Sequence, residues 1–228
     1  MAPVIEVLRY TTKEGLADSD HQGTLSEASR TLLQQPGCRG VHSSPALEKD
    51  NKTHYLFIEW DSIDSHIAFT NKDIFEPFFE KLSTVFEGSP NVYHASLSPE
   101  HPPVLHNAEG KGDAKTAVVE LLHAYFPGGG GFTADQMAST AKNVQEFLGQ
   151  LRGNAKGHTG ENALGWVVEE LEFKGEKSRS FIFAIGWDSV EAHMKYRETE
   201  HFQKVIPLIR GLEGLKGIEM VHVSTKTW

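Results

Sequence analysis

The sequence contains one structural unit twice. Residues 56–66 read LFIEWDSIDSH, and residues 183–193 read FAIGWDSVEAH. At a separation of 127, Trp60, Asp61, Ser62, His66 and Phe75 recur as Trp187, Asp188, Ser189, His193 and Phe202. His94 and His222 match at a separation of 128, and the first strands align Glu6 with Glu120. Several matches in the same order indicate a duplication, so the fold must accommodate two copies of one unit.

Each copy predicts the element order β-α-β-β-α-β. Apolar alternation and helical spacing in the first copy predict strands at 4–11, 40–47, 54–60 and 92–97, with helices over 24–35 and from 73 onward. The second copy repeats this order with strands at 116–126, 164–173, 179–187 and 217–225, and helices over 133–151 and 189–211. The order is that of the ferredoxin-like unit, an α+β fold. We therefore predict domains at residues 1–98 and 115–228, joined by a Pro- and Gly-containing linker at 99–114.

Composition and charge exclude several classes of protein. Lys and Arg number 22 against 31 Asp and Glu, and this negative charge disfavours nucleic-acid binding. The single cysteine, Cys38, cannot form an intrachain disulfide, which is consistent with a reducing compartment. The first residues enter a strand pattern without the features of a signal peptide, and no apolar run is long enough to span a membrane. We expect a soluble, cytoplasmic protein.

Residues 60–75 and 187–202 resemble the dimeric α+β-barrel superfamily, and within it the antibiotic-biosynthesis-monooxygenase-like branch. The resemblance rests on a strand ending in Trp, a short acidic helix start, a His, and then a His-Phe pair, which the second copy shows as His201-Phe202. It implies two ferredoxin-like units whose sheets pair into one barrel. Because both units lie on one chain, we expect pairing within the chain, with a homodimer as the alternative.

The resemblance also implies a small-molecule cleft between each sheet and its helices. Strand alternation places His94 and His222 on the last strands, and Arg9 and His123 at matching positions on the first strands. His201 has Ile74 as its counterpart in the first copy, so the second copy has the fuller histidine set. We predict His123, His193, His201 and His222 as candidate catalytic residues, and Trp187, Arg9, His94 and His66 as candidate substrate-binding residues. The alternative for each histidine is a structural, hydrogen-bonded role.

The activity that the resemblance implies is cofactor-independent oxygenation of a phenol- or anthrone-type ring, or cyclisation, dehydration or decarboxylation on the same scaffold. Such reactions belong to secondary metabolism and act on aromatic or polyketide-like substrates. A neutral His can abstract a phenolic or α-carbon proton in an apolar pocket. We expect no cofactor and no metal, because the histidines lack metal-binding spacing. The alternatives are a non-catalytic or stress-associated protein that binds a hydrophobic ligand, and a haem-binding protein.

Overall fold

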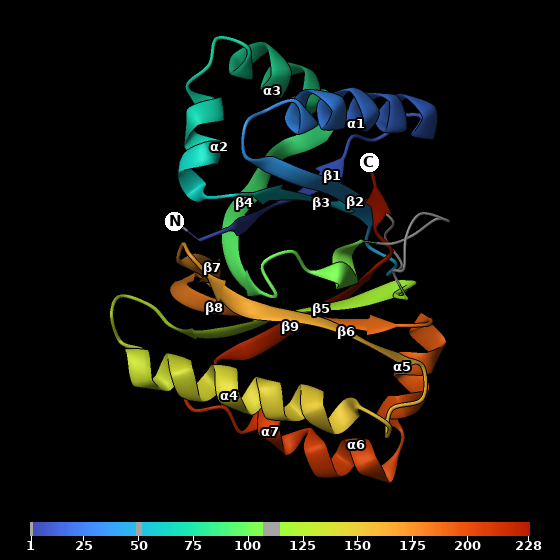
Figure 1. Ribbon diagram of the computed structural model, residues 1–228, viewed down its shortest axis with the longest axis vertical. Coiled ribbons are helices and arrows are strands. Elements are labelled where there is room, and N and C mark those ends of the chain that lie inside the picture. Colours follow the sequence, from blue (N-terminus) through green and yellow to red (C-terminus); the bar gives the residue numbers. More distant parts are fainter. Residues whose placement is uncertain (1, 49–51, 107–114) are drawn as a thin grey trace.

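The computed structural model describes residues 2–48, 52–106 and 115–228, which form two stacked halves with their sheets facing each other (Figure 1). The elements of the N-terminal half are β1 (Val4–Thr12), α1 (Asp18–Leu33), β2 (Cys38–Pro45), β3 (Thr53–Trp60), α2 (Ile63–Thr70), α3 (Phe75–Ser83) and β4 (Phe86–Ser98). Its strands pair in the order β2-β3-β1-β4, and its helices lie on the outer face of this sheet.

The C-terminal half repeats this arrangement. It contains β5 (Val118–Pro127), α4 (Ala134–Leu151), β6 (His158–Val167), β7 (Leu171–Phe173), β8 (Glu176–Trp187), α5 (Val190–Arg197), α6 (Glu200–Val205), α7 (Pro207–Arg210) and β9 (Gly217–Val223). The strand order β6-β8-β5-β9 matches that of the first half, and β7 adds a short hairpin to β8. The predicted strand at 164–173 is thus two strands, because the chain leaves the sheet after Val167.

The two sheets join at both edges and close a barrel within one chain. On one side β4 pairs antiparallel with β6, with Ala95 opposite Val167 and Ser98 opposite Leu164. On the other side β9 meets the end of β2 through a bridge between Ala46 and Val223, and β10 (Lys226–Thr227) then pairs with β2. The predicted fold class, two tandem ferredoxin-like units forming an intrachain α+β barrel, is confirmed.

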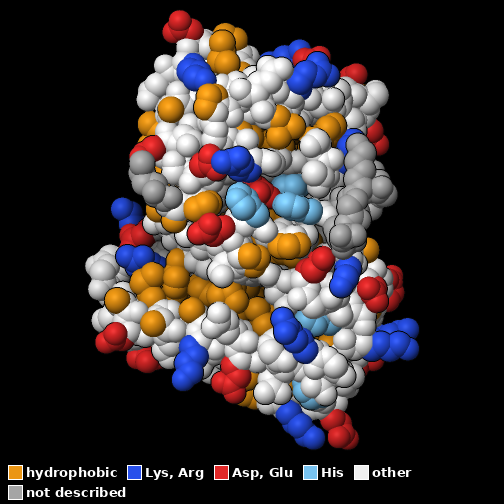
Figure 2. Space-filling model, viewed as in Figure 1, with side chains coloured by type: hydrophobic (Ala, Val, Ile, Leu, Met, Phe, Trp, Pro, Cys, Tyr) orange, Lys and Arg blue, Asp and Glu red, His pale blue; other side chains and the backbone are white. Residues whose placement is uncertain are grey.

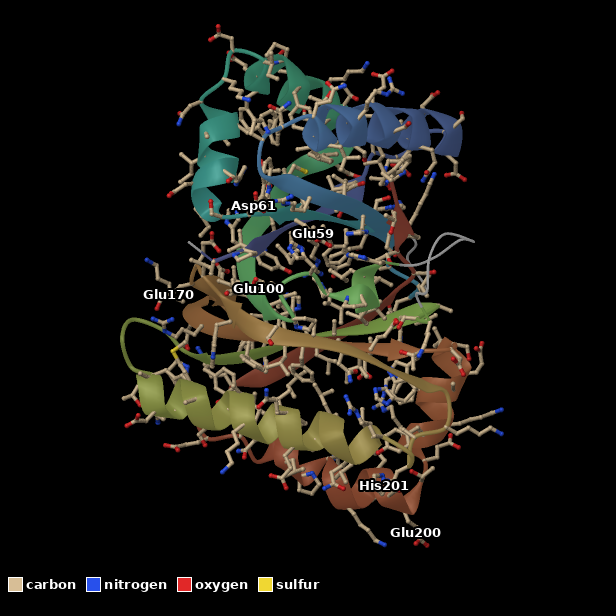
Figure 3. The ribbon with its side chains drawn as sticks, viewed as in Figure 1. Glu59, Asp61, Glu100, Glu170, Glu200 and His201 are labelled. Atoms are coloured by element: carbon tan, nitrogen blue, oxygen red, sulfur yellow. The ribbon has the colours of Figure 1, made fainter. Side chains whose placement is uncertain are left out.

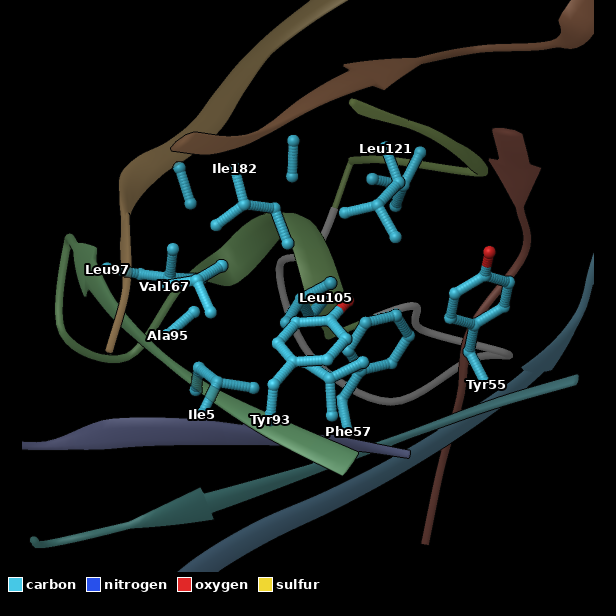
Figure 4. Close-up of a cluster of buried hydrophobic side chains, with 14 of the residues drawn as sticks. Ile5, Tyr55, Phe57, Tyr93, Ala95, Leu97, Leu105, Leu121, Val167 and Ile182 are labelled. Carbon is cyan, nitrogen blue, oxygen red and sulfur yellow. The ribbon is translucent and has the colours of Figure 1, made fainter. Parts of the chain in front are cut away.

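Among the described residues, the alternation of the strands produces three apolar cores. One core lies between the two sheets and contains Phe57, Tyr93, Leu121 and Ile182 (Figure 4). The other two lie between each sheet and its helices, and their largest members are Trp60 and Trp187. Successive side chains of a strand point to opposite faces of the sheet. Neighbouring residues of a strand therefore face the barrel interior and the helices in turn.

Local sequence signals explain where the helices begin. Thr133 caps α4 in a capping box with Gln136. The repeated Asp-Ser pairs place Ser62 before α2 and Ser189 before α5, and each serine accepts a hydrogen bond from a backbone N–H three residues later. The duplicated motif is therefore, in part, a helix start repeated in both halves.

Part of the predicted linker is packed into the barrel. A short 3-10 helix, Pro103–Leu105, buries Val104 and Leu105 in the core between the sheets, and the Leu105 carbonyl accepts a hydrogen bond from Thr225. Residues 107–114 of the linker, and residues 49–51 between the predicted strands at 40–47 and 54–60, lie outside the described residues. The domain boundaries at 98/99 and 114/115 stay predictions.

Replacing Gly165 with Ala is expected to weaken the β4–β6 edge. A Cβ atom at Gly165 would lie 1.8 Å from the Ser96 carbonyl oxygen, so the two strands must separate. We expect a loss of about 1–3 kcal/mol in the free energy of unfolding, typical of overpacking, measured in urea. Gly23→Ala on exposed α1 is the control, since nothing lies within 4 Å of its Cβ position; it should gain roughly 0.5–1 kcal/mol. Equal stability of G165A and wild type would contradict this account.

Candidate functional site

Each half contains the same chain of closely spaced acid and imidazole groups. In the N-terminal half, the Trp60 indole N–H donates to Glu6 Oε2 at 2.7 Å, and His66 Nε2 lies 3.5 Å from Glu6 Oε1. The other nitrogen of His66, Nδ1, lies 2.8 Å from His94 Nε2. His94 Nδ1 then lies 2.6 Å from Glu169 Oε1. Glu6, His66, His94 and Glu169 thus form a continuous chain, which we call the first relay.

The C-terminal half contains a second relay in equivalent positions. The Trp187 indole donates to Glu120 Oε2 at 3.1 Å, and His193 Nε2 lies 3.3 Å from the same oxygen. His193 Nδ1 lies 2.7 Å from His222 Nε2, and His222 Nδ1 lies 2.9 Å from Glu48 Oε1. The second relay therefore consists of Glu120, His193, His222 and Glu48.

Each relay ends on a glutamate from the other half of the molecule. Glu169 follows β6 and also accepts a hydrogen bond from the His94 backbone N–H. Glu48 follows β2 and accepts one from the His222 backbone N–H. The side chains of Glu48 and Glu169 are 43% and 39% exposed, whereas Glu6 and Glu120 are buried. Each relay thus connects a buried carboxyl group with solvent, across the edge where the two sheets join.

Burial sets the protonation of the relays. It raises the pKa of Glu120 to about 7, against the hydrogen bond from Trp187 and the charge of Arg197. Burial, together with the charges of His222 and Arg197, lowers the pKa of His193 to about 3. In the first relay, burial likewise raises the pKa of Glu6 to about 7 and lowers that of His66 to about 4. Near neutral pH the imidazoles of His66 and His193 are uncharged, and the carboxyl groups of Glu6 and Glu120 are partly protonated.

A cavity of about 310 Å³ lies between the C-terminal sheet and its helices. Its polar lining consists of Glu120, Trp187, His193, Tyr196, Arg197 and Arg210. The remaining wall is apolar and includes Leu122, Phe147, Phe183, Phe202, Ile206, Ile209, Ile218 and Met220. An apolar chamber with a few converging polar groups is the usual form of a small-molecule site.

The N-terminal half fills the equivalent space with aromatic rings. At the separation of 127, Phe78 and Phe79 occupy the places of Val205 and Ile206. Phe78 contacts Phe69 edge to face, with ring centroids 5.3 Å apart, and Phe79 stacks on Phe75 at 5.9 Å. The polar groups differ as well: Tyr196, Arg197 and Arg210 correspond to Phe69, Thr70 and Ser83. The wall of the C-terminal cavity has Ile206 where the first half has the Phe79 ring, and two arginines give the cavity positive charge.

The structure brings together some of the residues predicted from the sequence and separates others. His193, His222 and Trp187 lie together in the second relay, and His66 and His94 lie together in the first. His201 does not line the cavity: its Nδ1 lies 2.8 Å from the Tyr196 hydroxyl, and Figure 3 shows it on α6 at the outer end of the molecule. His201 therefore contacts the cavity only through Tyr196.

Arg9 and His123 line a different cavity, of about 330 Å³, at one end of the barrel interior. His123 Nε2 lies 2.6 Å from the Tyr93 hydroxyl, and burial lowers the pKa of His123 to about 4. His123 lies on one face of β5 with Val119 and Leu121, and that face looks into the barrel. Its neighbour Glu120 is the residue that faces the helices and the C-terminal cavity.

Sequence reasoning missed Glu48 and Glu169 as site residues. They follow β2 and β6, and their separation of 121 falls outside the 127–128 register of the repeat. Glu6 and Glu120, in contrast, form a repeated pair in the sequence. A glutamate that recurs within two apolar strands is a feature from which a site residue could have been predicted. Both are placed beside a Trp and a His of the duplicated motif.

Replacing Glu120 with Gln should change how stability depends on pH. The folded protein retains the Glu120 proton up to about pH 7, whereas the unfolded chain releases it near pH 4.5. The stabilisation from this group is therefore present below pH 4.5 and is lost as pH rises to 7. Between about pH 5 and pH 8, wild type should lose about 2–3 kcal/mol relative to the variant. Urea unfolding at both pH values measures this difference, and identical pH profiles would contradict it.

Comparison with known proteins assigns part of the chain to a family. Residues 3–81 match the family model described as antibiotic biosynthesis monooxygenase. These residues form an antibiotic biosynthesis monooxygenase domain. A comparison with curated protein sequences finds no match. The C-terminal half, which the family model does not match, repeats the element order and strand pairing of this domain.

Solved structures share the whole tandem fold. A candidate monooxygenase from Fusobacterium nucleatum is 9% identical, with a TM-score of 0.63 over 99% of this chain and 94% of its own. A candidate monooxygenase from Lactobacillus acidophilus is 12% identical, with a TM-score of 0.60 over 100% and 96%. An anthrone oxidase-like protein is 14% identical, with a TM-score of 0.62 over 100% and 94%. At these identities the likeness establishes the fold alone.

Proposed function

We propose that the protein is a cofactor-independent oxygenase of a small aromatic, anthrone-like substrate, which binds in the C-terminal cavity. One observation carries the proposal: the second relay ends at an apolar chamber. Glu120 and His193 are both in the wall of this chamber, beside Arg197 and Arg210. The family match and the fold shared with an anthrone oxidase-like protein support this class of reaction. A cytoplasmic location stays a prediction.

Glu120 is the general base in this proposal. Its pKa of about 7 matches the pH at which a base must both accept and release a proton. It removes a proton from the ring methylene of the substrate, leaving a carbanion delocalised onto the ring oxygen. Arg197 and Arg210 provide positive charge for that oxygen from the cavity wall. The predicted catalytic histidines His193 and His222 then act as the relay that takes the proton away.

The proton leaves through the second relay. It passes from Glu120 to His193, then to His222, and reaches solvent at the half-exposed Glu48. The neutral state of His193 suits this task, because a neutral imidazole can accept a proton on one nitrogen and release one from the other. Each turnover thereby restores the Glu120 carboxylate without opening the cavity.

The oxidation is balanced with dioxygen alone. The carbanion transfers an electron to dioxygen, and recombination forms a C–O bond and a hydroperoxide, which takes up a proton. Loss of water then converts the ring methylene into a carbonyl group, so that one oxygen atom enters the product and the other leaves as water. No external reductant is required.

The test is oxygen consumption by the purified protein with hydroxyanthrones as substrates. We expect uptake of one dioxygen per substrate, and a single labelled atom in the product carbonyl when the gas is ¹⁸O₂. The rate should rise with pH through about 7, as the Glu120 carboxyl group ionises. Tight binding of hydroxyanthrones without oxygen uptake would refute the oxygenase and favour the ligand-binding alternative.

A further inference from the structure

A second polar cluster lies outside both relays, at the inner face of the N-terminal sheet. Glu59, on β3, is buried, and its carboxylate forms hydrogen bonds with three imidazole rings. His42 Nε2 and His106 Nε2 lie 3.0 and 2.7 Å from Glu59 Oε1, and His101 Nδ1 lies 2.9 Å from Oε2. Figure 3 shows Glu59 between the two halves, and histidine side chains gather at this waist in Figure 2. We call these four residues the Glu59 cluster.

The members of the cluster come from three separate segments. His42 lies on β2 opposite Phe57, while His101 and His106 flank the short helix that is packed into the barrel. The His42 and His106 rings stack with centroids 4.8 Å apart. Glu59 and His42 are buried, whereas the His101 and His106 side chains are 49% and 42% exposed. The cluster is therefore fixed on its barrel side and open to solvent on the other.

The arrangement matches the ligand set and spacing of a transition-metal site. One ligand atom from each of His42, Glu59 and His106 lies within 4.8 Å of the other two. A tetrahedral ion with bonds of about 2.0–2.1 Å separates its ligand atoms by about 3.3 Å. The two nitrogens at 3.0 and 2.7 Å from Glu59 Oε1 must therefore move by only about 0.3–0.6 Å to admit an ion.

Surrounding groups orient the ligands. His42 Nδ1 lies 2.9 Å from the Thr227 hydroxyl, so Nδ1–H can donate to Thr227 while Nε2 faces Glu59. Metal-binding histidines commonly have their second nitrogen held in this way. His101 holds the second oxygen of Glu59. A Cβ atom on Gly40 would lie 3.1 Å from His42 Nε2, so the glycine keeps space beside the nitrogen.

We propose that His42, Glu59 and His106 bind a divalent first-row transition-metal ion such as Zn²⁺, with His101 and Thr227 positioning the carboxylate and His42. Imidazole and carboxylate ligands suit ions of this class. The fourth coordination position faces the exposed side of the cluster and is open to water. Bound metal would attach the segment after β4 to strands β2 and β3, at the end of the barrel. The site is independent of the C-terminal cavity and of the oxygenase proposal.

The experiment is a Zn²⁺ titration of tag-free protein treated with chelator, followed by calorimetry, with Co²⁺ absorption as a second readout. We expect His106→Gln to remove one equivalent of bound Zn²⁺, or to weaken its binding at least about 100-fold, and to remove the tetrahedral Co²⁺ absorption. His106 is half-exposed, so this variant should fold. His101→Gln and Thr227→Val should weaken binding about 10–100-fold.

His158→Gln is the matched control. His158 is a partly buried histidine that hydrogen-bonds Asn162, outside the cluster. The His158→Gln variant should bind Zn²⁺ with the stoichiometry and affinity of wild type. The proposal is overturned if wild type binds no Zn²⁺, or if His106→Gln binds it with the stoichiometry and affinity of wild type. Oxygen consumption is not needed for this measurement, so its outcome does not depend on the proposed reaction.

Discussion

Replacing Glu120 with Gln should lower kcat/KM by about 10²–10⁴, the usual effect of removing a general base. Gln retains the size of Glu and can still accept the Trp187 hydrogen bond, but it cannot take the substrate proton. The melting temperature at neutral pH should not fall, because a buried carboxyl group with a raised pKa is replaced by a neutral amide. Steady-state oxygen consumption and thermal unfolding measure the two effects separately.

Glu6→Gln is the matched control for this prediction. Glu6 has the same Trp and His partners and the same raised pKa, but phenylalanine rings occupy the space equivalent to the cavity. We expect Glu6→Gln to change stability about as Glu120→Gln does. Its kcat/KM should stay within about threefold of wild type, because a loss of at least about 10² is expected only for the catalytic copy. If the two variants lose activity equally, the proposed asymmetry between the halves is wrong.

Replacing Ile206 with Phe should abolish turnover by filling the C-terminal cavity. Ile206 is in the cavity wall, and Phe79 at the equivalent place packs against Phe75 in the N-terminal half. A ring at position 206 can therefore adopt a packing that the fold already contains. We expect a loss of about 100-fold or more in substrate affinity or kcat/KM, which corresponds to about 3 kcal/mol, with little loss of stability. Fluorescence titration with a hydroxyanthrone and urea unfolding provide the measurements.

The reverse exchange, Phe79→Ile, is the control for Ile206→Phe. It removes a ring from the N-terminal packing and should lower stability while sparing activity. Unchanged ligand binding in Ile206→Phe would show that the substrate binds elsewhere, for example in the barrel cavity lined by Arg9 and His123.

The repeat made the fold predictable from the sequence. Alternation and the paired WDS motifs define two units, and a sheet with one uncovered face must be buried against another. The sequence does not show which face of β5 looks inward, because β5 is buried along nearly its whole length on both faces. Its apolar pattern therefore could not separate Glu120, which faces the helices, from His123, which faces the barrel and stays a predicted site residue.

The relay glutamates were unpredictable for a different reason. Glu48 and Glu169 contact histidines 174 and 75 residues away, in the opposite half, and the contact exists only after the sheets have joined. The cavity had a signal in the sequence, since Val205 and Ile206 replace two phenylalanines. Reading that signal requires knowing that these positions face the sheet.

The difference between His201 and Ile74 does not coincide with the wall of the C-terminal cavity, and a catalytic role of His201 stays a prediction. A polar residue in only one of two copies suggested a site in that copy. In the structure Ile74 is 48% exposed, and His201 lies beside the Tyr196 hydroxyl without lining the cavity. A position at the surface can change between the copies without any change in the chamber below it.

The exchange of glutamates between the halves has a consequence for how such a protein can diverge. In an assembly of two identical chains, every substitution appears in both sites at once. Here the two sites are encoded separately, so one half can exchange its chamber for a rigid aromatic filling while the other keeps the chamber open. Yet the filled half still supplies Glu48 to the open one. The half with the aromatic filling therefore supplies one residue of the second relay, and under the proposed function its loss would remove Glu48 from the C-terminal site.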